Sequence, residues 1–166
     1  MIRTTVKRSR LLVVVASALA ILPGVTIHAQ SVNPQVGTWQ LNLAKSTHSA
    51  GPAPKSATIK IEAVDTRRKV VYDGVLADGS KAHMEYTADY DGKDNPLTGT
   101  DGGLADTAAL TRINPTTTQV IYKMAGKVTT TQTTAVSADG KTLTVSMSGA
   151  DPGGQAMTSV AVYDRR

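Results

Sequence analysis

The feature that most constrains the fold of this chain is a strict alternation of apolar and polar residues. In 57–63, for example, alanine and isoleucine occupy every second position between threonine, lysine and glutamate. Successive side chains of a strand point to opposite faces, so this period indicates strands with one buried and one wet face. No segment has a convincing helical period, and 104–110 would form at most a turn or two of helix. The four segments that alternate cleanly are 38–43, 57–63, 82–90 and 142–148.

Turn sequences separate these strands from five weaker ones, which we expect at 69–76, 107–113, 118–124, 127–136 and 155–163. Asp-Gly and Ala-Gly pairs supply the positive φ angles that tight hairpins need. The turns lie at 77–80, 91–93, 114–115, 125–126 and 138–140. Such short, even spacing predicts an all-β fold, a single antiparallel up-and-down β-barrel of about eight to ten strands.

Two longer loops interrupt this rhythm, at 44–56 and 95–103. Loops of this length inside a compact domain often have a function, such as covering a binding site. Each loop could cover one end of the barrel, and the alternative is an ordered surface loop without a function.

The N-terminal segment has the pattern of a secretory signal peptide. A basic stretch at 3–10 precedes an unbroken small and apolar run at 11–22, and a small-residue cleavage motif ends at Ala29. A membrane anchor is the alternative, but about twelve apolar residues fall short of the ~20 that a spanning helix needs. Paired arginines of a twin-arginine signal are missing, and no cysteine is present for lipid attachment. We therefore predict a signal peptide at 1–29, a single domain at 30–166, and a periplasmic or secreted protein.

The charge of the mature chain is close to neutral. Removing 1–29 takes away four basic residues, leaving 14 positive against 13 negative side chains in 137 residues. Nucleic-acid binding would need a clustered basic face, so we expect no nucleic-acid partner. The one basic run, 67–69, is interpreted as a solvated hairpin end rather than a phosphate or acidic-partner site. We also expect no membrane span in the mature chain and a monomer.

Three phrases of this sequence resemble small, secreted lipocalin-like proteins of bacteria. They are the opening 36–42, which contains Gly37-Thr38-Trp39, the loop 44–56, and the segment 86–93. The similarity extends over nearly the whole mature chain. The chain differs from true lipocalins in ending at its last predicted strand, without their C-terminal helix, and in having no disulfide.

This resemblance implies a structural role for the Gly-x-Trp motif. In lipocalins the tryptophan closes one end of the barrel beneath an arginine from the last strand. Gly37 and Trp39 would therefore form the closed end here, with Arg165 or Arg166 over the indole. A planar guanidinium stacks favourably on an aromatic face.

Residues suited to metal binding or catalysis do not form a convincing set. His83 and Glu85 share one strand face, but that face is the polar one, which favours an exposed pair. His48 is isolated in a loop, and no third ligand at a recognisable spacing supports zinc. Asp89, Asp91 and neighbouring residues fail the order of a calcium-binding loop and are interpreted as a hairpin turn. We expect no catalytic residues, no metal and no cofactor, and a protein that is not an enzyme.

The residues predicted to line the barrel follow from taking Trp39 as a marker of the inner face. An eight-stranded barrel is just wide enough to hold one small ligand or to be filled by side chains. Arg112 shares a strand face with Leu110, and if inward it would need a partner such as a ligand carboxylate. The alternative register leaves Arg112 in solvent. The predicted lining residues are Met84, Tyr86, Tyr90, Arg112, Tyr122, Met124 and Met147.

Three functions are compatible with these observations. The leading hypothesis is reversible binding of a small apolar or amphipathic molecule in the lumen, oriented by tyrosine hydroxyls and Arg112. The second is a filled, ligand-free barrel that acts as an envelope or extracellular interaction module. The third is a barrel enzyme such as an isomerase or hydratase. A lumen below about 300 Å³ would favour the interaction module over ligand binding.

Overall fold

The structure is a computed structural model that describes residues 33–49, 52–99, 105–150, 154 and 156–166. The predicted signal peptide at 1–29 lies outside these residues. The elements of the described part are β1 (Gly37–Leu41), the 3-10 helix η1 (Leu43–Lys45), β2 (Thr47–His48), β3 (Ser56–Val64), β4 (Arg67–Val75), β5 (Lys81–Ala88), β6 (Asp91–Gly99), β7 (Thr107–Asn114), β8 (Thr117–Met124), β9 (Lys127–Val136), β10 (Thr142–Ala150) and β11 (Ala156–Arg165). No helix in these ranges has the length and hydrophobicity of a membrane span.

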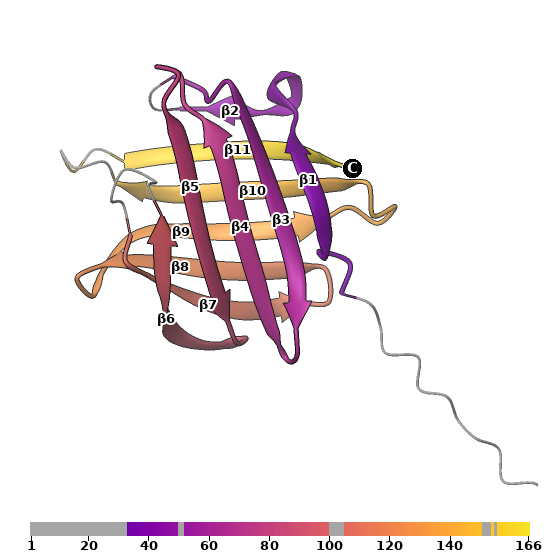
Figure 1. The fold of residues 1–166 in the computed structure, drawn as a ribbon, viewed down its shortest axis with the longest axis vertical. Helices are drawn as coiled ribbons and strands as arrows, with labels where there is room; N and C mark the ends of the chain where they lie inside the picture. The colour runs from indigo at the N-terminus through magenta and orange to yellow at the C-terminus, as the bar shows by residue number, and fades with distance from the viewer. Residues whose placement is uncertain (1–32, 50–51, 100–104, 151–153, 155) are drawn as a thin grey trace, which may run out of the picture. The chain divides into compact units, whose positions relative to one another are not determined.

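The strands of the described part form one closed antiparallel barrel (Figure 1). From β3 to β11 each strand pairs with the next in sequence, β1 pairs with β3, and β1 closes the ring by pairing with β11. Ten strands make this ring in the described residues, and the short β2 pairs with the opposite end of β11. The predicted all-β, up-and-down barrel is therefore confirmed.

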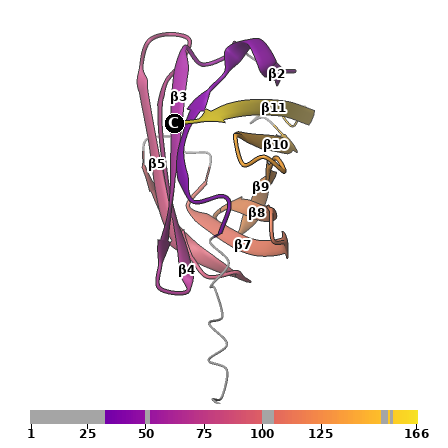
Figure 2. The same cartoon turned by 90° about the vertical axis from the view of Figure 1, so that its right-hand side faces the viewer.

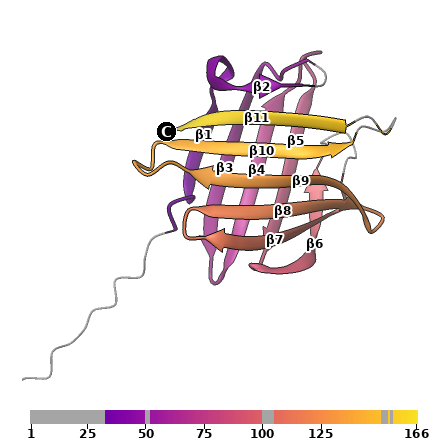
Figure 3. The ribbon, with the colours of Figure 1, turned by 180° about the vertical axis from the view of Figure 1, so that it is seen from behind.

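The barrel wall is folded into two layers of crossing strands. β1, β3, β4 and β5 run side by side in one layer, and β7 to β11 cross behind them (Figures 1 and 3). Figure 2 shows the two layers edge-on. β6 pairs with both β5 and β7, which connects the layers on one side, and the β1–β11 pairing connects them on the other. The inner faces of both layers carry the buried apolar residues that the alternation predicted.

Two strands lie where loops or turns were expected. β2 falls within the predicted loop 44–56, and β6 includes both the predicted turn 91–93 and the described part of the predicted loop 95–103. The chain reverses instead at 89–90, and a register shift follows at the start of β6. β6 was not predicted because Leu97 is its one buried residue, so its sequence does not alternate between apolar and polar residues.

One local prediction is wrong at the edge of a strand. Leu43 was placed on the inner face with Trp39, but it lies in η1 and is 45% exposed. The Asn42 side chain accepts a hydrogen bond from the backbone N–H of Lys45, which caps this short helix and ends the strand pattern at Leu41. The described part of 104–110 contains no helix and holds the start of β7 at Thr107, in agreement with the strand expected at 107–113.

Candidate ligand-binding cavity

One end of the barrel is closed by the segment that precedes β1. The side chain of Gln35 is 1% exposed. Its Nε2 donates to the backbone oxygens of Thr116 and Thr134, at 2.9 and 3.0 Å, and so reaches across to the β7–β8 turn and to β9. The backbone oxygen of Gln35 accepts a hydrogen bond from Trp39 Nε1 at 2.9 Å. These contacts tie the two layers together across the closed end.

Arg165 covers the tryptophan at this end, as the resemblance implied. Its guanidinium carbon lies 4.2 Å from the centre of the Trp39 ring, and Trp39 is 0% exposed. Arg165 also donates three hydrogen bonds of 2.6–2.8 Å to the backbone oxygens of Pro34, Val36 and Gly140.

Gly37 provides the room that this arginine needs. A Cβ at position 37 would lie 2.5 Å from Arg165 Nη1, and the glycine adopts a φ of +147°. The Gly-x-Trp motif and its arginine therefore form one packed unit.

Arg68 is buried inside the barrel, whereas the arginine expected there was Arg112. The run 67–69 was interpreted as solvated, but Arg68 is 2% exposed and lines the interior. This interpretation is wrong at Arg68 because side chains alternate along β4, which places Arg68 on the inner face with Val70 and Tyr72. Its neighbour Lys69 points the other way and pairs with Glu85 at 3.1 Å.

The buried guanidinium has few partners. Arg68 Nη1 donates to Thr118 Oγ1 at 2.7 Å, and that hydroxyl donates to Gln35 Oε1 at 3.2 Å. Arg68 Nε has no hydrogen-bond partner among the described residues. No carboxylate in the described ranges forms an ion pair with Arg68. The guanidinium is thus a buried positive charge held by neutral groups.

The lumen contains a cavity of about 630 Å³. Its apolar wall includes Leu41, Ile59, Val70, Ala82, Leu143 and Val145. Its polar lining includes Arg68, Tyr72, Tyr122, Gln132, Thr134 and Tyr163. Pro54 and Leu76 also line it, and they flank the paired ends of β3 and β4 that lie away from Arg68. The cavity therefore extends along β4 from the buried arginine toward the opposite end of the barrel.

Buried tyrosines add hydroxyl groups to this lining. Burial raises the pKa of Tyr163, and the neighbouring Tyr72 raises it further. Burial also raises the pKa of Tyr72. Both hydroxyls are therefore neutral at physiological pH and able to form hydrogen bonds with a polar group in the cavity.

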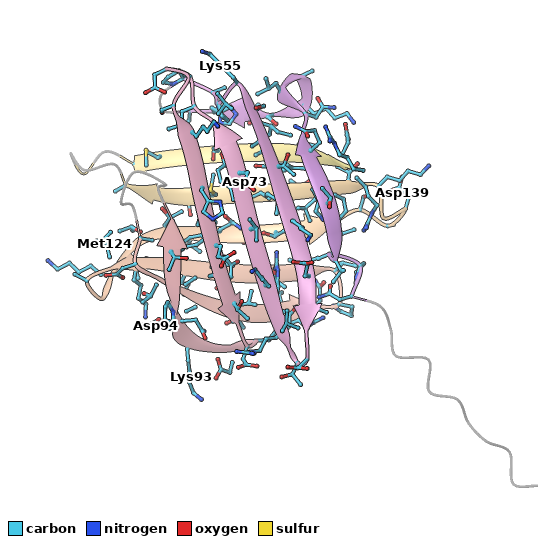
Figure 4. The ribbon with its side chains drawn as sticks, in the orientation of Figure 1. Lys55, Asp73, Lys93, Asp94, Met124 and Asp139 are labelled. Atoms are coloured by element: carbon cyan, nitrogen blue, oxygen red, sulfur yellow. The ribbon has the colours of Figure 1, made fainter. Side chains whose placement is uncertain are left out.

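Three of the predicted lining residues line this cavity: Met84, Tyr122 and Met147. Tyr86 is instead packed in the core, its ring edge-to-face with Tyr122 at 6.3 Å between centroids. Met124, near the end of β8, does not line the cavity, and Figure 4 places it at the edge of the barrel.

Arg112 and Tyr90 pair with each other at the solvent side of the closed end. The Arg112 guanidinium carbon lies 4.0 Å from the centre of the Tyr90 ring, and Arg112 is exposed. The Tyr90 hydroxyl accepts a hydrogen bond from Asn33 at 2.8 Å. Arg112 therefore lies in solvent although Leu110, two residues before it on β7, is buried, and the inward arginine of the described barrel is Arg68.

The candidate polar clusters of the sequence lie on the outside. His83 Nδ1 is 2.8 Å from Asp73 Oδ1, and both side chains are well exposed. Asp91 and Asp94 pair separately with Lys93 and Lys123. Figure 4 shows Lys93 extending away from the barrel. The described residues contain no group of three side chains placed to hold a metal ion.

Comparison with known proteins yields only distant similarities. No family model matches the chain, and no curated protein matches it. The chain is similar to EF1p2_mFAP2b bound to DFHBI, with 11% identity, 80% of this chain and 94% of that chain covered, and a TM-score of 0.48. It is similar to zebrafish ileal bile acid-binding protein complexed with cholic acid, with 11% identity, coverages of 80% and 99%, and a TM-score of 0.49. The siderocalin Ex-FABP gives 11% identity, coverages of 80% and 74%, and a TM-score of 0.37.

Four buried polar residues of the site were not anticipated from the sequence: Gln35, Arg68, Thr118 and Thr134. Arg68 carried a usable signal, since it alternates in phase with Val70 and Tyr72. Gln35 carried none, because its partners lie 81 and 99 residues away in the chain.

Proposed function

We propose that this barrel reversibly binds a small apolar or amphipathic molecule in its lumen. The observation that carries the proposal is the cavity of about 630 Å³, within the ~300–1,000 Å³ of ordinary ligand sites. A barrel filled by its own side chains, acting through its surface, would have a lumen below that range. Apolar side chains form one part of the wall, and arginine, tyrosine, glutamine and threonine supply polar groups. Such a lining suits a ligand with an apolar body and a polar end.

The proposal is binding without chemical conversion. Apart from the tyrosines, the ionisable side chains of the described lining are Arg68, His48 and Asp78. No hydrogen bond or ion pair joins any two of these three. General acid–base catalysis requires such groups to converge on one reacting atom. This arrangement supports a binding protein over an isomerase or hydratase.

We also propose that the protein works outside the cytoplasm, in the periplasm or in the medium. The basic and apolar pattern of 1–29 supports this proposal. N-terminal sequencing of the protein from the cell envelope and the medium tests it. We expect a chain that begins at or near Gln30, and a chain that keeps residue 1 and stays in the cytoplasm would contradict export.

Native mass spectrometry of the exported protein, purified without detergent and mixed with dodecanol, tests lumen binding. We expect a complex of one protein with one ligand, because the proposed binding site is a single cavity. Recovery of the bare polypeptide mass alone, repeated with retinol and dodecanoate, would favour the interaction module instead.

Two substitutions at neighbouring positions test whether the ligand binds inside the lumen. Ala82 is buried and lines the cavity, so Ala82→Trp should fill part of the lumen and prevent binding. Lys81 precedes it on β5 and is exposed, so Lys81→Trp should bind as the unmodified protein does. Circular dichroism establishes that both variants fold. Equal binding by both variants would place the ligand outside the lumen.

A further inference from the structure

We infer that the ligand carries a single carboxylate, which the buried guanidinium of Arg68 binds at the inner end of the cavity. This inference rests on the proposed lumen binding and specifies the chemical class of the ligand. It requires an accessible cation, the absence of a competing counter-charge, and room for an apolar body beyond the head group.

The charge of Arg68 is uncompensated within the described chain. The side chain is 2% exposed, one of its nitrogens donates to the neutral hydroxyl of Thr118, and Nε has no partner. A buried charge without a counter-ion is costly, whereas a paired and hydrogen-bonded one is tolerated. An arginine in contact with the cavity retains the capacity to pair with a carboxylate through charge-assisted hydrogen bonds.

The surroundings of Arg68 are suited to a negative group. The lining side chains connected to its partner Thr118 are neutral: Thr134 is the cross-strand partner of Thr118, and Gln132 donates a hydrogen bond to the Thr134 hydroxyl. Its cross-strand partners on β3 and β5 are Ala63 and Ala88, whose side chains are small. No carboxylate of the described residues lies within ion-pair distance to repel an anion.

The length of the cavity accommodates an apolar body behind the carboxylate. Arg68, Val70, Tyr72 and Leu76 line it along β4 and the residue that follows. Eight residue steps of a strand span roughly 26 Å. A ligand that enters from the end near Leu76 would reach Arg68 with its head and leave its apolar part against the inner wall.

A single negative charge fits this site better than a phosphate monoester. Arg68 is the one Lys or Arg side chain in the described lining. A phosphate monoester carries about −1.5 to −2 charges near neutral pH, which would leave negative charge unbalanced in a buried site. A carboxylate matches the one guanidinium and can accept two parallel hydrogen bonds from it.

Calorimetric titration of the exported protein with three ligands of one chain length tests the inference. Dodecanoate, dodecanol and dodecylamine differ in the charge of the head group. We expect dodecanoate to bind about 10- to 100-fold more tightly than dodecanol, the range expected for charge-assisted hydrogen bonds. Dodecylamine should bind most weakly, because its ammonium group would face the guanidinium.

Two arginine variants assign the preference to one residue. Arg68→Met should abolish the preference for dodecanoate and keep the binding of dodecanol. Arg112→Met makes the same chemical change at an exposed arginine and should keep the full preference. A preference that survives in Arg68→Met would overturn the assignment to Arg68.

The outcomes separate this inference from the function on which it rests. Equal affinities for dodecanoate and dodecanol in the unmodified protein would overturn the carboxylate and leave lumen binding intact. Failure of all three ligands to bind would overturn both. If Arg68→Met does not fold, nuclear magnetic resonance of the arginine Nε–H groups in the unmodified protein decides. Dodecanoate, and not dodecanol, should shift the Arg68 signal strongly, and an unshifted signal would contradict the inference.

Discussion

The guanidinium carbon of Arg165 lies 4.2 Å from the centre of the Trp39 ring. Arg165 joins the last strand to the first, and its hydrogen bonds hold the backbone of Pro34 and Val36. One side chain therefore contributes both to the closure of the barrel between β1 and β11 and to the position of the segment that covers its end.

Replacing this arginine should destabilise the barrel. Arg165→Ala removes the stacking on Trp39 and three hydrogen bonds, and we expect a loss of about 1 to 3 kcal/mol in the free energy of unfolding. Urea denaturation measures it. Arg166→Ala is the matched control, since Arg166 bonds to Thr38 through its backbone N–H. Equal stabilities of the two variants would contradict the structural role of Arg165.

Gln35 should stabilise the folded protein about as much as Arg165 does, although it lies outside any strand. Gln35→Ala leaves the backbone oxygens of Thr116 and Thr134 without this donor at the closed end of the barrel. We expect a loss of about 1 to 3 kcal/mol in urea denaturation. Gln40→Ala removes the hydrogen bond to the backbone oxygen of Ala57 and the one from the Thr58 hydroxyl, but its side chain is less buried, so it should cost less than about 1 kcal/mol. A Gln35 variant as stable as the Gln40 variant would show that the seal does not depend on this side chain.

The strands that could be read from the sequence are those with one buried face. β3 and β5 alternate cleanly because their outer residues meet water, and both appear within two residues of the expected bounds. β6 could not be read in this way, since a strand with a single buried residue has no period to detect. The end of β1 at Leu41 and the start of η1 at Leu43 depend on the Asn42 cap, which the alternation does not reveal.

The site was predictable only in part, and the two arginines show why. The face of Arg112 was read correctly as that of Leu110, but a face does not tell how far along the barrel a side chain lies. Arg68 occupied an inward position in the alternation of β4, and its charge argued against burial. The partners of Gln35 come from distant strands, so no local pattern could reveal them.

Removing the buried charge should not weaken the unliganded protein. Arg68→Met replaces an unpaired buried cation with an apolar side chain, and the bond from Thr118 to Gln35 remains. We expect unchanged stability or a gain of about 1 kcal/mol or more in urea denaturation. Adding dodecanoate should stabilise the unmodified protein more than the variant, because binding stabilises the folded state in proportion to affinity. A loss of about 3 kcal/mol in the variant would instead indicate a structural role for Arg68.

The way in which the stability of the protein falls at acidic pH should depend on Asp164. The hydrogen bond from Asn42 and the bond from Lys45 lower the pKa of this carboxyl. Because the folded-state pKa lies below the unfolded one, the stabilisation is present above the ordinary value of about 4 and is lost as the pH falls through the lowered value.

Thermal unfolding followed between neutral pH and strongly acidic pH tests this dependence. Asp164→Asn should have a flatter profile on the acid side than the unmodified protein. Asn42→Ala removes the main cause of the lowered pKa and should flatten the profile in the same sense. Profiles that keep their full slope in both variants would contradict the role of this pair.

Methyl resonances of the methionines provide the most direct test that the lumen is the binding site. Met84, Met147 and Met157 line the cavity, and Met124 does not, so the chain contains both reporters and a control. Titrating methyl-labelled protein with dodecanoate should shift the three lumen signals together and leave Met124 in place. Shifts confined to Met124, or no shift at saturating dodecanoate, dodecanol and retinol, would contradict a ligand in the barrel.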